Sequence, residues 1–220
     1  MKQTYENNKR RIQAFKLTAD LKDDNGVVHH FVDGYEYVEI GGLKWATCNI
    51  GAENETDGGL YFAWGETKGY KDANKKYFLW DDYELMGEHL LKYSRDDGLT
   101  TLEACDDAAT QNMGRNWRMP TKEDFITLLS STTKKWTAVN GVNGRLLTDK
   151  ADESKKLFFP TVGNCDYGRV YSVGSYCLYW SSSLSMSSVC NGSLLFFGGA
   201  SCGMSHIRRC NGLPVRGVIK

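Results

Sequence analysis

Short apolar segments alternate with turn-forming residues along most of the chain. Residues 37–47 alternate apolar and polar positions around a Gly-Gly pair, which predicts a half-buried β-hairpin. Residues 58–65 form a second aromatic segment bounded by glycines, which we expect to be a core strand or loop. The tight-turn signals are Asp24-Asn25-Gly26, Asp33-Gly34, Gly41-Gly42, Asn140-Gly141 and Asn143-Gly144.

Helical signals are confined to the middle of the chain. Strong helix formers run from Thr100 to Met113 and end on Gly114, the residue expected at a helix C-terminus. A second helix is predicted to begin after Thr121, whose hydroxyl can cap the first turn with Asp124 as its partner. Two helices within an otherwise β and loop protein predict an α+β fold.

The stretch Val170–Ile207 contains 38 residues without a Lys, Arg, Asp or Glu. Within it, the segment SLLFF (193–197) is apolar at consecutive positions, so both faces of a strand there would be apolar. Such a strand is either central and covered on both sides or part of an exposed apolar surface, and exposed apolar patches mark binding sites. The neighbouring small Ser, Gly and Cys residues favour the exposed surface.

Charge and cysteine content exclude several classes of protein. Basic and acidic residues balance at 27 each, so no field favours nucleic acid or an anionic membrane, and no apolar run is long enough to insert into one. Seven Cys without a CxxC pair predict free thiols rather than a disulfide scaffold. The polar residues 1–13 carry no signal peptide, and we expect them to be frayed or to serve attachment.

Several motifs in one order resemble a known family. The segments LKWATCNIGA (43–52), LYFAWGET (60–67), CDDAATQNMGRNWRMPTKEDFITLL (105–129) and YWSSS…RCNGLPVRGV (179–218) are similar to the major paralogous proteins of Fibrobacter succinogenes, a family abundant in gut Bacteroidales. The resemblance implies a C-type-lectin-like domain of the formylglycine-generating-enzyme type over residues 33–220. Residues 1–32 would then be an N-terminal extension that serves attachment or oligomerisation.

The enzymes of that superfamily use metal sites that the sequence does not reproduce. Formylglycine-generating enzymes resemble copper oxidases with a closely spaced Cys pair, whereas the late cysteines here are 13, 12 and 8 residues apart. The four His also lack metal-ligand spacing. We therefore expect no enzyme activity and no cofactor. Calcium bound by Glu103, Asp106 and Asp107 is an alternative, although acidic residues are also favoured at a helix start.

A non-enzymatic group with this fold consists of the variable proteins of diversity-generating retroelements. In that group, adenines of a C-terminal segment are randomised, and AAC or AAT codons changed only at adenines never encode Lys, Glu, Gln, Met or Trp. Residues 181–208 contain no Lys, Glu, Gln or Trp. The family pattern sets Leu195, Phe197 and Met204 on fixed apolar positions. Met186 must also be fixed, and Cys202 departs from the pattern.

This resemblance implies a ligand-binding surface over about residues 177–210. Its anchors would be Leu194, Phe196 and Ile207, and the partner would be a macromolecule, a protein or glycan on a cell surface. The predicted surface residues are Cys177, Ser185, Ser187, Ser188, Val189, Cys190, Leu194, Phe196, Gly198, Ser201, Gly203, Ser205, His206, Ile207, Arg208 and Cys210.

The remaining residues are assigned to the scaffold. We expect Trp45, Trp64, Trp117 and Trp180 in the core. We expect arginines 118, 209 and 216 to bridge loop carbonyls or carboxylates. A phage tail or a bacterial surface is the expected location, with the cytoplasm as the alternative. The rival functions are a surface lectin or adhesin of fixed specificity and a metalloenzyme of the formylglycine-generating type.

Overall fold

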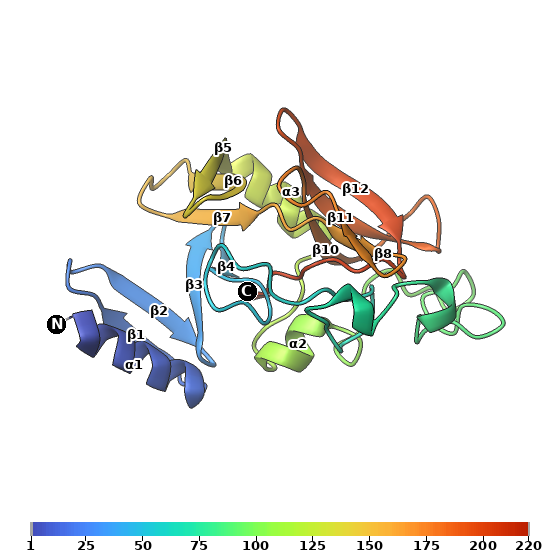
Figure 1. The fold of residues 1–220 in the computed structure, drawn as a ribbon, viewed down its shortest axis with the longest axis horizontal. Helices are drawn as coiled ribbons and strands as arrows, with labels where there is room; N and C mark the ends of the chain where they lie inside the picture. The colour runs from blue at the N-terminus through green and yellow to red at the C-terminus, as the bar shows by residue number, and fades with distance from the viewer. Residues whose placement is uncertain (1, 220) are drawn as a thin grey trace.

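The computed structural model describes residues 2–219, which have an α+β architecture of few helices and several small antiparallel sheets (Figure 1). The first sheet has the order β1-β2-β3-β4-β13. It begins at the N-terminus and is closed by a strand from the far end of the chain. Its strands are β1 (Ala19–Lys22), β2 (Val28–Val32), β3 (Tyr35–Ile40), β4 (Leu43–Ala46) and β13 (Val218–Ile219).

The turns of this sheet are the ones that the sequence predicts. Gly26 lies in the β1–β2 turn at φ 85°, and Gly41 and Gly42 join β3 to β4 at φ 62° and 78°. Such positive φ values are accessible to glycine without a steric penalty, so the local sequence is sufficient to place these turns. Because β2 pairs with β3 through Val32 and Tyr35, the predicted boundary between residues 32 and 33 falls at a turn inside one sheet.

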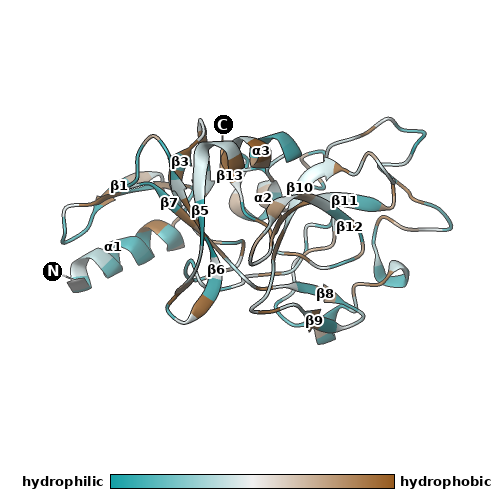
Figure 2. Cartoon of the chain, turned by 90° about the horizontal axis from the view of Figure 1, so that it is seen from above, coloured by the Kyte–Doolittle hydropathy of each residue, from teal (hydrophilic) through white to brown (hydrophobic). Residues whose placement is uncertain are grey.

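Of the two expectations for residues 1–13, fraying is wrong for residues 2–13, which belong to the helix α1 (Lys2–Ala14). It packs beside β1, and its Lys9 pairs with Glu36 of β3 at 3.1 Å. Ile12 is buried, whereas the rest of the helix is largely polar and mostly teal in Figure 2. With so narrow an apolar stripe, tertiary contacts hold the helix more than its own sequence does.

The two central helices are present, but the first is shorter than predicted. It is α2 (Ala108–Met113), and it begins where the Asp107 carboxylate accepts the Thr110 amide at 2.8 Å. Residues 100–102 instead hydrogen-bond to the strand formed by residues 177–184. The helix α3 (Lys122–Ser131) has the predicted capping box between Thr121 and Asp124.

A second sheet shares a buried cluster with the first, to which it contributes Leu147, Leu157 and Phe159. Its order is β5-β6-β7, with β5 (Thr132–Val139), β6 (Val142–Asp149) and β7 (Lys156–Pro160). Asn140-Gly141 forms the β5–β6 turn, but the turn predicted at Asn143-Gly144 is wrong, because both residues lie in β6. A Cβ on Gly144 would lie 2.3 Å from the Phe158 ring, so this glycine serves close packing rather than a turn.

The remaining strands lie together on the side away from α1 (Figures 1 and 2). One sheet has the order β10-β11-β12, with β10 (Cys177–Leu184), β11 (Asn191–Phe197) and β12 (Cys202–Arg208). The hairpin of β8 (Asn164–Asp166) and β9 (Arg169–Tyr171) precedes it. Short 3-10 helices at Ala73–Lys75 and Trp80–Asp82 occur in the long loop region before α2.

The core confirms the scaffold assignments. Trp45, Trp64, Trp117 and Trp180 are each at most 1 % exposed. Arg216 is fully buried and donates to the carbonyls of Ala46, Thr47 and Phe158 and to the side chain of Asn49. Arg209 donates to the carbonyls of Lys92 and Tyr93, and Arg118 to the carbonyl of Met119 and to Asp124. Arg209 and Arg216 in this way join segments that are distant in the sequence, whereas Arg118 bonds locally.

Candidate ligand-binding surface

The β10-β11-β12 sheet carries most of the predicted surface residues, and its register decides which of them share a face. Paired residues of antiparallel strands point to the same side of a sheet. Leu195 pairs with Met204 and Phe197 with Cys202, whereas Phe196 pairs with Gly203 and Gly192 with Ile207. The first set therefore lies on one face of the sheet and the second set on the other.

The face that carries Leu195 and Phe197 belongs to the core. Both side chains are fully buried in a cluster with Phe125 and Leu128 of α3, and Met204 packs against the same cluster. These are the apolar residues that the family pattern sets on fixed positions. A polar substitution at any of them would place an unsatisfied group against α3, which gives a physical reason to expect them to be constant.

The opposite face is covered on β11 and open toward β12. Leu194 is 2 % exposed and packs in the cluster that contains Trp64 and Trp180. Phe196 is half-buried, and on β12 the residues of this face are exposed or half-buried. For most of SLLFF (193–197), the interpretation as a central strand covered on both sides is therefore correct.

Five of the predicted surface residues are buried, which corrects their placement. Cys177 donates its thiol to the Phe159 carbonyl at 3.0 Å, and Leu194 packs against the core tryptophans. Gly198 is covered because its carbonyl accepts from Arg145, and Cys210 lies in a cluster with Phe78 and Tyr83. Ser185 is 5 % exposed. The buried residues are Cys177, Ser185, Leu194, Gly198 and Cys210.

The other eleven predicted residues are accessible, and we call them the display face. They come from one strand at the edge of the sheet, one residue of its neighbour and the two loops that join the three strands. Ser187, Cys190, Ser201, Ser205 and His206 are exposed, and Ser188, Val189, Phe196, Gly203, Ile207 and Arg208 are half-buried. His206 and Arg208 pair with Ser193 and Asn191, so these two point to the side of the sheet that carries Leu195, near the end of β12.

Electrostatic contacts tie the end of β12 to the β8–β9 hairpin. Arg208 donates to Asp166 at 2.8 Å, and its guanidinium carbon lies 5.7 Å from the centre of the Tyr167 ring. Contact with Tyr167 and the carboxylate of Asp166 raise the pKa of Arg208, so this residue is charged at any physiological pH. Its ion pair makes that corner of the display face close to neutral.

Arg145 fixes the turn between β11 and β12. It is 7 % exposed, and one of its terminal nitrogens donates to the Gly198 carbonyl and to the Gly199 carbonyl, the latter at 3.2 Å. Its guanidinium lies 5.2 Å from the Trp136 ring and 5.8 Å from the Phe197 ring. No motif in the sequence signals this contact, because it depends on how β6 packs beside β11.

The thiols are free and fall into two classes. All seven Cys lack a disulfide partner, as predicted, with Cys105, Cys190 and Cys202 exposed. Burial raises the pKa of Cys165, Cys177 and Cys210 to about 12, so these three are inert at neutral pH.

The acidic residues considered for calcium are engaged by the protein itself. Lys92 places its Nζ 2.5 Å from a carboxylate oxygen of Glu103 and of Asp106, with Cys105 3.6 Å away. Asp107 accepts the Met119 amide at 2.8 Å and caps α2. Within residues 2–219, the Glu103–Cys105–Asp106 group is the one cluster whose ligand atoms converge, and an ammonium group already lies among them.

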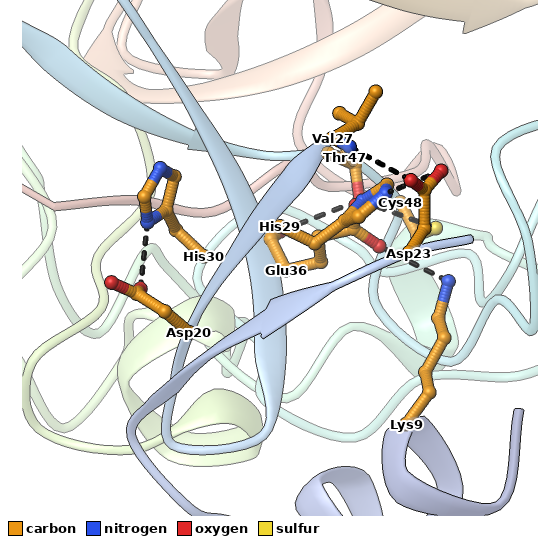
Figure 3. A network of polar contacts seen from close by, with 9 residues as sticks. All are labelled: Lys9, Asp20, Asp23, Val27, His29, His30, Glu36, Thr47 and Cys48. Atoms are coloured by element: carbon orange, nitrogen blue, oxygen red, sulfur yellow. Dashed lines mark hydrogen bonds and ion pairs between the residues drawn. The ribbon is translucent and has the colours of Figure 1, made fainter. Parts of the chain in front are cut away.

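A separate cleft of about 740 Å³ lies between α1 and residues 46–54. Beside it, His29 contacts Glu36 at 2.6 Å and Asp23 at 3.6 Å, and Lys9 reaches the same glutamate from α1 (Figure 3). The cleft wall mixes basic and acidic side chains and carries no set of convergent groups aimed into the space. Of these contacts, the Lys9–Glu36 ion pair attaches α1 to the sheet.

Comparisons with protein-family models, curated proteins and solved structures find no match to this chain in any of the three. Among the described residues 2–219, no helix is long and apolar enough to cross a membrane.

Proposed function

We propose that this chain is a non-enzymatic ligand-binding protein, a variable protein of a diversity-generating retroelement built on a C-type-lectin-like fold. The observation that carries this proposal is the division of the β11–β12 ladder into two faces. Leu195, Phe197 and Met204, expected to be fixed, share the face packed on α3. Most strand residues expected to vary lie on the opposite face, namely Phe196, Gly203, Ser205 and Ile207. His206 and Arg208 lie on the α3 side but remain accessible near the end of β12.

This division lets side chains change without cost to the core. Substitutions at exposed positions away from caps, ion pairs and buried contacts usually change stability by no more than about 0.5 kcal/mol. Ser205 is exposed on the face opposite α3, on a strand held by a complete ladder to β11. A rigid strand that presents tolerant positions is what a diversified binding surface requires.

The buried residues narrow the proposed contacts to the display face. Cys177, Leu194 and Cys210 lie in the core, so we expect selection against most substitutions there even if their codons can mutate. Phe196 and Ile207 remain as apolar anchors for a macromolecular ligand. We propose a phage tail or a bacterial surface as the location of such a receptor.

Deep sequencing of the gene segment for residues 177–210 tests the proposal. A population grown from one clone would be compared with a nearby template copy, and the segment for residues 132–160 would serve as the internal control. We expect substitutions confined to adenines, enriched at display-face codons and depleted at Leu195, Phe197 and Met204. Substitutions spread over all four bases, or equally frequent in the control segment, would contradict it.

The rival function, a lectin of fixed specificity, has less support from the geometry. Trp45, Trp64, Trp117 and Trp180 are buried and do not offer stacking platforms for a sugar. The Lys92 ammonium already contacts both Glu103 and Asp106 and cancels one of their two negative charges.

A further inference from the structure

A second set of exposed apolar side chains lies next to the display face, outside the segment that the sequence marks as variable. Tyr167 is 58 % exposed, Tyr171 45 % and Tyr176 41 %, and Val170 and Val173 between them are 41 % and 63 % exposed. We call these five residues the aromatic rim. They belong to the β8–β9 hairpin and the loop that leads into β10.

The aromatic rim is continuous with the display face. The Tyr176 ring lies 5.5 Å from the Phe196 ring, and the Tyr167 ring lies 5.7 Å from the Arg208 guanidinium. Both contacts join a rim residue to a display-face residue. Figures 1 and 2 agree in placing the β8–β9 hairpin beside the β10-β11-β12 sheet.

The rim is held in place by backbone hydrogen bonds. Cys165 and Gly212 exchange two of them, at 2.8 and 2.9 Å, which fixes β8 to the C-terminal core. The Gly174 amide donates to the Thr161 carbonyl at 2.9 Å, and the Tyr176 amide to the Ser172 carbonyl at 3.1 Å. Ordered aromatic side chains lose little conformational freedom on binding, which favours affinity.

The charge of this region limits the chemistry of a ligand. No charged residue occurs from Val170 to Ile207, and Arg208 is paired with Asp166. Arg169 is exposed and has no ion-pair partner among the described residues 2–219, and arginine is common at protein interfaces. A surface this close to neutral complements an uncharged patch and offers little to an anionic polymer.

We infer that the aromatic rim is a constant part of the binding site and that the ligand is a folded protein presenting an uncharged apolar patch; this inference rests on the proposed function. The tyrosines and valines of the rim would bury mainly apolar area on binding and offer few hydrogen-bonding groups. Such a surface suits another protein better than a hydroxyl-rich glycan. The rim supplies affinity that is common to all variants, and the display face supplies discrimination among ligands.

The test displays the full chain on yeast with the eleven display-face positions randomised. The library is selected separately on ubiquitin, a folded protein, and on dextran, a neutral glycan. Selected clones then receive Tyr171→Ser with Tyr176→Ser. The matched control is Phe15→Ser with Leu17→Ser, which removes two exposed apolar side chains next to α1. Thermal unfolding of each variant checks folding, and Val173→Ser repeats the test at the most exposed rim position.

We expect binders to ubiquitin whose Kd rises at least about tenfold with the rim substitutions and less than about twofold with the control pair, because buried aromatic anchors dominate interfaces. Folded clones that keep their affinity without the rim tyrosines would overturn the inference and leave the proposed function standing. Rim-dependent binders to dextran alone would overturn the choice of a protein ligand. A library without binders to either probe would count against the proposed function itself, and the inference would fall with it.

Discussion

Replacing Arg145 with Met should loosen the β11–β12 turn while leaving most of the fold intact. Methionine keeps much of the apolar contact with Trp136 and Phe197 but removes both hydrogen bonds to the Gly198 and Gly199 carbonyls. The two hydrogen bonds share one donor nitrogen, so together they contribute about 3 kcal/mol, and the lost cation–π contact adds about 1 kcal/mol.

Part of this loss is offset. The guanidinium is buried and its Nε has no hydrogen-bond partner, a cost of about 1–3 kcal/mol that the substitution removes. The net effect on local opening is about 2 kcal/mol, which corresponds to about a 30-fold change in the opening equilibrium.

Hydrogen exchange read by mass spectrometry or NMR measures this opening. The Gly198 amide, which donates to the Ser201 carbonyl at 2.8 Å, should exchange about 30-fold faster in Arg145→Met. Arg145→Lys keeps the charge but not the planar guanidinium, so its exchange rate should fall between those of the unchanged protein and Arg145→Met. Lys150→Met, which removes an exposed bond to the Ser130 carbonyl, is the control. Equal protection of residues 197–203 in all variants would refute the conclusion that Arg145 fixes this turn.

Three further predictions concern packing, charge and thiol reactivity. Gly192→Ala should lower the free energy of unfolding by about 1–3 kcal/mol in urea titration, because its Cβ would lie 2.6 Å from a buried indole, whereas Gly203→Ala, with no atom within 4 Å, should be near neutral. Burial raises the pKa of Asp124, but hydrogen bonds from its arginine partner and from the helix cap outweigh it and hold the pKa below its ordinary value. The stabilisation by the Asp124 carboxylate is therefore present above its unfolded-state pKa and lost as the pH falls through its folded-state pKa. Asp124→Asn should lower the free energy of unfolding by about 1 kcal/mol at pH 7 and leave it unchanged in strong acid, as followed by thermal unfolding. Iodoacetamide at pH 8 should label Cys190 and spare Cys177 until the chain is denatured, as read by peptide mapping.

The sequence was sufficient to predict those features that depend only on neighbouring residues. The capping box of Thr121 and Asp124 and the Asn140-Gly141 turn depend on neighbouring residues only, and both are present. The α+β class follows from the same signals. The core position of Trp180 was also predictable, because a large apolar ring among apolar neighbours is rarely left exposed.

The sequence was insufficient where distant segments decide the outcome. Asn143-Gly144 reads as a turn, but the ring of Phe158 needs the space above Gly144. Leu194 reads as an exposed anchor, yet Trp64 arrives from over a hundred residues away to cover it. The sequence gives one indication of the aromatic rim, because its tyrosines lie in or next to the long uncharged stretch. Their exposure, however, depends on how the β8–β9 hairpin packs.

Arg216 and β13 follow the display face in the chain, and the core is incomplete without them. A chain that stops within the display face lacks the guanidinium that joins the Ala46, Thr47 and Phe158 carbonyls and the strand that pairs with β4. Such a fragment cannot close its first sheet. Folding of the first sheet therefore requires the chain to be complete: a product that ends early, at a premature stop or after a frameshift within residues 177–210, should fail to fold even though most of its residues are present.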